Sequence, residues 1–490
     1  MSSIGFDEDS LILGELAESA HVDQRARVAN QFETVLTCCE VIADALTVMF
    51  AAALSYFLYH GLGLGRHVIY SSGTVFVAAT VFAGLQVLLL DREGAYRLGS
   101  SLLRIRETER VLRASVIGFL LVSPVPSLTG HLVSRWVIIL AFFFVPALLI
   151  VQKHTMYLIV CALHNRGYGI RRVLIYGAGY TGRRVFSALA RSTKLGLEPV
   201  IVLDDDPGKC GEEVFDLSYS HERCLTISRG PLTRKLLDRN LIDMVIVAIP
   251  SLDRERFLTA CAEAAATGAS LAFVPGQSVP SDYQLDYTEI DGLLLGSFGK
   301  PPAKLRHRLL KRAFDLVVST TVLLLSLPVS ALVALLVKLD SPGPALFVQT
   351  RVGQNGKTFN MYKFRTMYTD APKYHYSPTD GSDMRITRLG RFLRRTSFDE
   401  VPQILNVIRG DMSLVGPRPE MPFIVAEYNA RQRQRLEVKP GVTGLWQLSA
   451  DRAHLIHENI HYDLYYIRNQ NFFMDLAILL HTAAFAMRGI

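Results

Sequence analysis

Long runs of apolar residues constrain this chain more than any other feature of its sequence. Four of them come early, and each is near the length of about 20 residues that a helix needs to cross a bilayer. They are Val41–Tyr59, Val68–Leu90, Val111–Leu128 and Val133–Val151. With 50% hydrophobic and 20% charged residues, the chain is too apolar for an ordinary soluble protein of 490 residues. The sequence predicts a bundle of four transmembrane helices at residues 41–152, after a cytoplasmic N-terminal segment at residues 1–40.

The positions of the basic residues predict how this bundle is oriented. The loop between the second and third runs and the segment after the fourth are rich in arginine, whereas the other two loops carry only Arg66 and Arg135. Basic loops stay in the cytoplasm, so we expect the middle loop and the chain after residue 152 to lie there. The net charge of +7 fits anionic headgroups or phosphorylated substrates, and we expect no nucleic-acid partner.

Strand-like and helix-like segments alternate through residues 165–295. This alternation predicts βαβ units and a parallel sheet, that is, a Rossmann-like cytoplasmic domain. The expected strands are Val173–Gly177, Pro199–Asp205, Met244–Pro250 and Ser270–Gly276.

A glycine-rich string follows the first expected strand of this domain. Gly177, Gly179 and Gly182 have the G-x-G-x-x-G spacing before a helix, and Asp204 follows about 20 residues later. Spacing and context fit a dinucleotide-binding site. The same glycines would also serve a tight turn and close helix packing. Nucleotide binding and a structural, dimerising or regulatory role therefore both stay open.

A fifth apolar run, Val317–Lys338, follows a linker and a basic amphipathic segment that we expect to lie in the membrane interface, together residues 296–315. Basic residues flank the run on both sides, which places both ends in the cytoplasm. Pro328 removes one helical hydrogen bond, and Ser326 is placed to satisfy groups released by a bend. A plain kinked span is the alternative. The pattern favours a re-entrant membrane helix at residues 316–338.

An adjacent acidic pair, Asp399 and Glu400, stands near a predicted helix start in the last part of the chain. Ser397 or Asp399 would cap that helix, whose N-terminus favours negative charge. Basic residues are arranged around the pair, and arginine in particular grips phosphate oxygens; they are Lys363, Arg365, Arg394 and Arg418. The pattern indicates phosphate chemistry. The alternative is structural, because Ser397 and Glu400 also have the spacing of a capping box.

Four strings occur in a fixed order after the apolar run that Pro328 interrupts: Leu339–Phe359, Tyr362–Met367, Arg394–Glu420 and Lys439–Ser449. Together they resemble the bacterial sugar transferase family, the polyprenyl-phosphate hexose-1-phosphate transferases. The resemblance covers roughly Lys304–Ile490, and the upstream spans and Rossmann-like module resemble the large members. The chain departs mildly from the family where it reads FDEVPQ instead of LDELPQ, and where Leu327 separates Ser326 from Pro328.

This resemblance implies a reaction and a place for it. Hexose-1-phosphate would pass from a UDP-sugar, UDP-glucose or UDP-galactose, to undecaprenyl phosphate with release of UMP. The reaction would start exopolysaccharide, capsule or O-antigen synthesis at the cytoplasmic face of the bacterial inner membrane. A mainly helical α+β catalytic domain at residues 339–490 and a homodimer are expected.

The resemblance also implies roles for single residues. Asp399 would be the nucleophile that forms a phosphosugar–aspartyl intermediate, and Asp399 and Glu400 would hold Mg²⁺. Lys363, Arg365, Arg394 and Arg418 would bind the substrate phosphates. The alternative reading from another class is a membrane-anchored nucleotide-sensing regulator, in which the Rossmann-like domain binds a ligand and the C-terminal part is structural.

Overall fold

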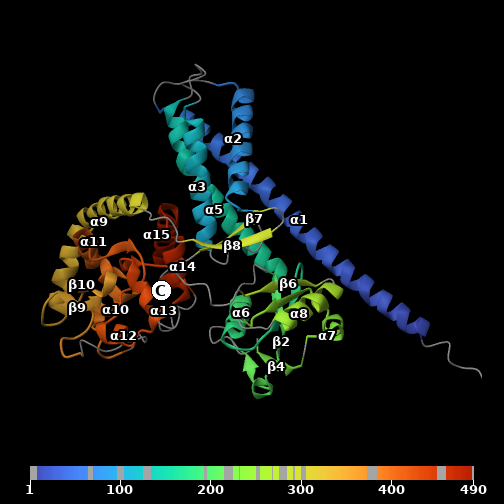
Figure 1. The fold of residues 1–490 in the computed structure, drawn as a ribbon. Coiled ribbons are helices and arrows are strands. Elements are labelled where there is room, and N and C mark those ends of the chain that lie inside the picture. Colours follow the sequence, from blue (N-terminus) through green and yellow to red (C-terminus); the bar gives the residue numbers. More distant parts are fainter. Residues whose placement is uncertain are drawn as a thin grey trace, which may run out of the picture. The chain divides into compact units, whose positions relative to one another are not determined.

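The computed structural model describes residues 8–64, 70–96, 104–124, 134–191, 196–214, 224–230, 232–249, 254–267, 269–274, 284–290, 293–299, 305–371, 383–449 and 460–487. The chain divides into two compact units, Met1–Pro302 and Ala303–Ile490 (Figure 1). The boundary between them falls within the segment that the sequence predicts as a linker. Each unit is described by itself.

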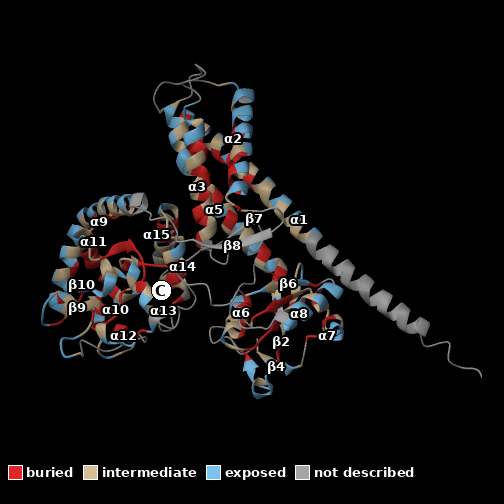
Figure 2. Ribbon diagram, in the orientation of Figure 1, coloured by how far each residue is buried: buried red, intermediate tan, exposed pale blue. Residues whose placement is uncertain are grey.

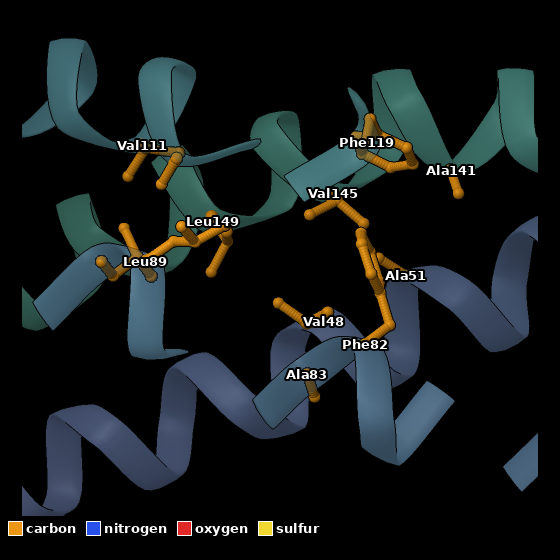
Figure 3. Close-up of a cluster of buried hydrophobic side chains, with 12 residues drawn as sticks. Val48, Ala51, Phe82, Ala83, Leu89, Val111, Phe119, Ala141, Val145 and Leu149 are labelled. Carbon is orange, nitrogen blue, oxygen red and sulfur yellow. The ribbon is translucent and has the colours of Figure 1, made fainter. Parts of the chain in front are cut away.

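The first unit begins with a helical bundle. Its helices are α1 (Glu8–Gly61), α2 (Ser72–Arg92), α3 (Arg104–Val122) and α5 (Arg135–Asn165). Figure 3 shows side chains from all four helices directed toward one another, among them Val48 of α1, Phe82 of α2, Phe119 of α3 and Val145 of α5. Large apolar side chains such as Phe57 and Phe143 remain exposed on the outside, as expected where lipid covers a bundle.

Four helices in the described part of the chain are long and apolar enough to cross a membrane by length and composition. They are Gln31–Gly61, Gly73–Arg92, Arg135–Asn165 and Leu309–Asp340. Three of them coincide with expected spans of the bundle, and the fourth contains the run predicted to be re-entrant. The expected third span, Val111–Leu128, is not among them.

The third helix differs from the prediction because it begins within the arginine-rich loop. Helix α3 starts at Arg104, so its first half is charged and only its second half is apolar. Ion pairs make this charged half compatible with the bundle, since Arg113 contacts both Glu93 at 3.1 Å and Glu109 at 2.6 Å. The residues after Pro124, where the expected span continues to Leu128, lie outside the described residues.

The predicted parallel α/β sheet follows the bundle. It has six strands in the order β3-β4-β2-β1-β5-β6, all parallel except for β3, which runs antiparallel to β4. Alternate residues of β1 (Arg171–Tyr176) belong to two different apolar clusters: Val173 and Ile175 lie in one cluster, and Leu174 lies in the other. Both faces of the sheet are therefore covered by apolar side chains. The strands are β1 (Arg171–Tyr176), β2 (Leu197–Asp204), β3 (Glu213–Val214), β4 (Leu225–Arg229), β5 (Met244–Val247) and β6 (Ser270–Phe273); the helices are α6 (Tyr180–Arg191), η2 (Pro207–Lys209), α7 (Arg234–Arg239) and α8 (Arg254–Ala266).

A β-hairpin that the sequence did not predict closes the first unit. Its strands, β7 (Gln284–Ile290) and β8 (Leu293–Gly299), pair antiparallel along their whole length. The second strand occupies the first residues of the segment that was predicted to be a linker.

The second unit combines one long helix with many short elements, as expected of a mainly helical α+β domain. Strands β9 and β10 form an antiparallel hairpin, and β11 pairs parallel with β12. The elements are α9 (Leu305–Asp340), β9 (Leu346–Val352), η3 (Gln354–Gly356), β10 (Thr358–Phe364), α10 (Arg388–Arg395), η4 (Phe398–Gln403), α11 (Ile404–Arg409), β11 (Ser413–Val415), α12 (Pro422–Ala426), α13 (Ala430–Arg433), η5 (Gln434–Glu437), β12 (Gly441–Thr443), η6 (Trp446–Leu448), α14 (His461–Asn469) and α15 (Phe472–Met487).

The N-terminal part of α9 is bonded to this unit. Lys311 contacts Asp475 at 2.8 Å, and Arg312 donates to two carbonyls in the last turn of α11 at 2.6 and 2.8 Å. Asp315 is buried and accepts from the hydroxyl of Ser413 at 2.8 Å. The sequence predicted an interfacial helix here, with its basic residues at lipid headgroups. Two of those residues, Lys311 and Arg312, are bonded to the protein, and the interfacial position of the helix stays a prediction.

The C-terminal part of α9 is packed against the same unit. Val333 and Val337 are buried in a cluster with Phe364 of β10 and Leu393 of α10. Most residues between the two attached ends are exposed or half-buried: Leu325 has 77% of its surface accessible, and Figure 2 draws much of α9 in the colours of exposed and intermediate residues. A straight helix of this length would extend about 54 Å, but Figure 1 draws α9 curved, and both of its ends contact one compact unit.

The two residues that were predicted to form a bend lie between the attached ends of α9. Pro328 lies within the continuous helix α9. The Ser326 hydroxyl donates to the carbonyl of Leu323 at 3.3 Å, one turn earlier. The carbonyl that Pro328 deprives of its helical donor is that of Leu324, so this bond lies beside the interrupted position and does not replace the missing one.

Candidate active site

The ion pairs around Glu400 join three separate parts of the second unit. Glu400 lies in η4, and its Oε1 atom accepts from Lys363 Nζ of β10 at 2.6 Å. The same oxygen accepts from Arg418 Nη2 at 3.1 Å. Three residues that are 37 and 18 positions apart in sequence are thereby brought to one point. The predicted grouping of these side chains is what the structure has.

Asp399 lies beside this ion pair but is more deeply buried. Only 8% of its surface is accessible, and its carboxylate makes no hydrogen bond to any residue that the structure describes. Burial raises the pKa of Asp399, although the charges of Lys363, Arg394 and Arg418 act in the opposite direction. Its oxygens are therefore not committed to protein donors, and the group is more basic than an exposed aspartate.

The neighbouring carboxyl has the opposite electrostatic environment. Burial alone would raise the pKa of Glu400, but the charges and hydrogen bonds of Lys363 and Arg418 outweigh it and lower the pKa to about 2. Two adjacent carboxyl groups are thus given different properties by their surroundings. Glu400 stays ionised at any physiological pH, and Asp399 is the more basic of the two. Such separation is typical of carboxylates with different chemical roles.

The backbone around the pair differs from the predicted helix N-terminus. Ser397 has φ of 56°, in the left-handed region, and its side chain makes no capping hydrogen bond. Residues Phe398–Gln403 form a 3₁₀ turn, and the α-helix begins only at Ile404. The structural alternative, a capping box between Ser397 and Glu400, is therefore not what the structure has. The ring of Phe398 stacks on Phe364 at a centroid distance of 6.3 Å, which fixes the turn to the hairpin that carries Lys363.

Arg394 approaches the pair from the last turn of α10. Its Nε donates to the Thr366 hydroxyl at 3.2 Å, and within the described residues its guanidinium forms no ion pair. Burial lowers the pKa of Arg394, whereas Asp399 acts to raise it. The guanidinium is thus a largely unbalanced positive charge near the buried carboxylate, as a phosphate-binding group would be.

Arg365 has a different environment from the other three predicted phosphate-binding residues. It is buried, with Nη2 donating to the carbonyl of Ser341 and Nη1 to that of Pro342, both at 2.7 Å. A third bond of 3.2 Å reaches the carbonyl of Val337. The carbonyls of Ser341 and Pro342 follow directly after α9, and that of Val337, in its last turn, also accepts from the amide of Ser341 at 3.4 Å. The structure therefore differs from the prediction: Arg365 is bonded to backbone carbonyls at the end of α9, whereas Lys363 and Arg418 are bonded to Glu400.

Comparison with known proteins identifies this unit. The sequence model of the bacterial sugar transferase family matches residues 306–489, and that of a CoA-binding domain matches residues 91–275. The UDP-glucose:undecaprenyl-phosphate glucose-1-phosphate transferase of Escherichia coli is 32% identical over 332 residues, which cover 65% of this chain and 68% of that protein. The chain belongs to the bacterial sugar transferase family. This sugar transferase is accordingly an enzyme, and the regulator alternative does not describe it.

Two further relatives of the sugar transferase differ in how much of their length is matched. The undecaprenyl-phosphate glucose phosphotransferase of Komagataeibacter xylinus is 45% identical over 188 residues, 35% of either chain. The undecaprenyl-phosphate galactose phosphotransferase of Salmonella typhimurium is 29% identical over 345 residues, 66% of this chain and 70% of that protein. The shorter match is the more similar one.

Two arginines near the site of the sugar transferase were not predicted as site residues. Arg351 donates to Gln349 Oε1 at 2.7 Å and to the carbonyl of Pro419 at 3.3 Å; burial, with Arg418 nearby, lowers its pKa to about 10. Arg435 is buried and donates to the carbonyl of Arg418 at 2.9 Å. Arg351 lies within the string Leu339–Phe359, but nothing in the sequence distinguishes it from the other basic residues of that string. Arg435 lies outside every string.

The glycine string of the α/β domain is largely explained by the fold of the sugar transferase. Gly177 has φ of 110°, and a Cβ atom on Gly182 would lie 1.7 Å from the carbonyl oxygen of Gly177. A Cβ on Gly179 would meet no atom within 4 Å. Asp204, which was predicted together with these glycines, accepts from the amide of Ala178 at 2.6 Å. Two glycines and the aspartate thus serve the loop itself, and nucleotide binding stays a prediction that rests on the motif and on Gly179.

Proposed function

We propose that this sugar transferase moves hexose-1-phosphate from UDP-glucose or UDP-galactose to undecaprenyl phosphate and releases UMP. The observation that carries the proposal is the buried Asp399, whose carboxylate makes no hydrogen bond within the described residues, beside Glu400, whose carboxylate binds Lys363 and Arg418. The name of the Escherichia coli relative supports the UDP donor, and the names of the Escherichia coli and Salmonella relatives together support the two sugars and the lipid acceptor. Synthesis of a surface polysaccharide is the process that such a lipid-linked sugar would start.

The reaction that we propose proceeds in two displacements. A carboxylate oxygen of Asp399 attacks the sugar-bearing phosphorus of the donor, and the bond from that phosphorus to the bridging oxygen breaks, so that UMP leaves. An oxygen of undecaprenyl phosphate then attacks the same phosphorus. The bond to Asp399 breaks, the carboxylate is regenerated, and the product is a lipid diphosphate sugar. A carboxylate nucleophile divides one difficult displacement into two easier ones.

Charge neutralisation is the main task of the remaining side chains. Phosphoryl transfer depends on positioning and on stabilising the charge that spreads over the phosphate oxygens. Lys363, Arg394 and Arg418 are the cations that act electrostatically on Asp399. Before substrate binds, two of them are held by Glu400. Donor phosphates would share these cations with Glu400, which keeps the cations in place without burying them unpaired.

The carboxylates fit the magnesium ion that the family implies. Glu400 uses only its Oε1 atom for the two cations, and Asp399 has no protein donor among the described residues. No group of three or more such ligands occurs in the described part of the chain. Magnesium is commonly bound by one or two carboxylates together with substrate phosphates, so two are sufficient. When bound, the ion would neutralise the charge on the pyrophosphate of the donor.

We further propose that α9 is re-entrant and that the α/β domain and the second unit both lie on the cytoplasmic face of a bacterial inner membrane. The two ends of α9 are attached to the same compact unit, and the exposed apolar residues lie between them. A straight crossing would place these two ends on opposite sides of a bilayer of about 30 Å. UDP-sugars are cytoplasmic, so the site has its donor only on that side.

A cysteine-accessibility measurement tests this topology. We expect a single cysteine introduced at the exposed Lys357, in a background without the native cysteines, to be labelled by a membrane-impermeant maleimide only after the cells are opened. A cysteine at Leu62, in the loop after α1, is the control that should react in intact cells. Labelling at position 357 in intact cells would show that α9 crosses the membrane.

A panel of UDP-sugars tests the reaction itself. We expect protein in nanodiscs to release UMP and to form a diphosphate-linked lipid sugar with UDP-glucose or UDP-galactose, and to require undecaprenyl phosphate for the lipid product. UDP-N-acetylglucosamine should give less than about one-hundredth of the rate if the site, like those of the relatives named for glucose and galactose, takes a sugar with a free 2-hydroxyl group in place of the larger acetamido group. If only N-acetylated donors react, the proposed sugar is wrong although the reaction class is right.

A further inference from the structure

The loop that carries Arg418 is held along its whole length. Four consecutive carbonyl oxygens, from Pro417 to Glu420, each accept a hydrogen bond, and the donors come from three separate parts of the second unit. The donors, in order, are the Gly441 amide at 2.9 Å, Arg435 Nη2 at 2.9 Å, Arg351 Nη1 at 3.3 Å and the Val352 amide at 3.0 Å. Two prolines restrict the same loop further, because their rings fix φ.

The first residue of the loop, Gly416, is also fixed by its backbone contacts. The Gly416 amide donates to the carbonyl of Thr443 at 2.9 Å. A Cβ atom at Gly416 would lie 2.5 Å from the carbonyl oxygen of Lys439, so a larger residue could not take this position without displacing β12. The loop is thus a platform with a defined place in the unit. The side chain of Arg418 extends from this platform to Glu400.

Arg435 is the most deeply buried of the side chains that hold the platform, with 3% of its side-chain surface accessible. Its guanidinium lies between two carboxylates, with Nη1 at 2.6 Å from Glu420 and Nε at 2.7 Å from Asp463. Nη1 also donates to the hydroxyl of Tyr428, which itself donates to Glu420. The charge of Arg435 is therefore balanced inside the protein, and its Nη2 is left for the carbonyl of Arg418.

We infer that Arg435 is a positioning residue for the proposed transfer reaction, acting through the carbonyl of Arg418 to set where the Arg418 guanidinium meets Glu400 and the donor phosphate. This inference rests on the proposed function. A planar guanidinium presents several donors in fixed directions, so it can hold two carboxylates and a carbonyl together. A displacement of a catalytic group by about 1 Å lowers a rate by about 100-fold, which is why a residue without substrate contact can matter.

The test uses the conservative variant Arg435→Lys in the full-length protein in nanodiscs. A lysine keeps the positive charge between Glu420 and Asp463 but cannot also reach the Arg418 carbonyl in the geometry of a guanidinium. We expect kcat/KM for the UDP-sugar to fall by about 100-fold, and the affinity for UMP, measured by calorimetry without turnover, to fall with it. Arg431→Lys, at an exposed arginine four residues earlier, is the matched control and should leave both unchanged.

A double-mutant cycle separates positioning from general damage to the fold. If Arg435 acts through Arg418, then Arg435→Lys should cause no further loss in an Arg418→Ala background. Losses that multiply, or a kcat/KM for Arg435→Lys within twofold of the wild type, would overturn the inference. Should Arg435→Lys fail to fold, Asp463→Asn replaces it in the same cycle, since that change weakens the hold on Arg435 without removing the guanidinium. If the wild-type protein itself releases no UMP from any UDP-sugar, the proposed function fails before the variants are compared.

Discussion

Asp399→Asn is expected to reduce both UMP release and the labelled lipid product to background, a loss of at least about 10⁴-fold. Asparagine has nearly the shape of aspartate, so the buried side chain still fits beside Glu400. It lacks the anionic oxygen that would attack phosphorus, and no other carboxylate can replace it, because Glu400 is held by two cations. The measurement is the release of UMP from radiolabelled UDP-sugar, followed by extraction of the lipid.

An exposed aspartate in the same unit provides the control for this substitution. Asp370→Asn changes the net charge in the same way at a side chain outside the site, and it should retain wild-type activity. Wild-type and Asp399→Asn proteins should bind UMP with similar affinity, since the cations that meet the phosphates are kept. If Asp399→Asn still releases UMP and labels the lipid at the wild-type rate, Asp399 is not the nucleophile.

The core of the site could be predicted because its residues stand in short strings with a fixed order. Asp399, Glu400, Lys363 and Arg418 were all taken from such strings, and the structure brings Lys363 and Arg418 to one oxygen of Glu400. The parallel α/β sheet was predictable for a similar reason, since strand and helix periods alternate in the sequence. In both cases each single signal is local: a short string of residues for the site, and the period of one strand or helix for the sheet.

The role of Arg365 could not be predicted because it depends on a distant partner. In sequence it is one basic residue among several, two positions after Lys363. Its hydrogen-bond partners are backbone carbonyls at the end of α9, more than 20 residues away in the chain. The pattern of charges contains no information about the end of that helix.

Two further differences have the same kind of origin. The third helix of the bundle starts earlier than expected because Arg113 forms ion pairs with Glu93, directly after α2, and with Glu109 of the same helix. A hydropathy pattern contains no information about such partners. Arg435 belongs to no string, and its importance appears only when the contacts of the Arg418 loop are followed. Residues that act through others are the part of a site that a single sequence conceals most.

Lys363→Met is expected to lower kcat/KM by about 10³-fold and to move the acid limb of its pH profile upward. Removing one charge-stabilising donor typically lowers a rate by between about 10²-fold and 10³-fold. Lys363 donates a hydrogen bond to Glu400, and its charge lowers the pKa of Asp399. The direction of the pH shift follows from its charge. Because Lys363 lowers the pKa of Asp399 against the effect of burial, its removal raises that pKa further, so that a higher pH is needed to ionise the nucleophile.

The measurement is kcat/KM from UMP release between pH 5 and 9, a working range of about four units around neutrality, compared with two other variants. Lys363→Arg keeps the charge and should preserve the acid limb, although its rate falls because a guanidinium does not occupy the place of an ammonium. Lys357→Met removes an exposed lysine from the same hairpin and should change neither quantity. A Lys363→Met protein that loses rate but keeps the wild-type acid limb would show that Lys363 binds phosphate without setting the ionisation of Asp399. An unchanged rate would show that Lys363 has no part in the reaction. Loss of a cation 2.6 Å from Glu400 must lower the rate if the reaction depends on neutralising the phosphate charge.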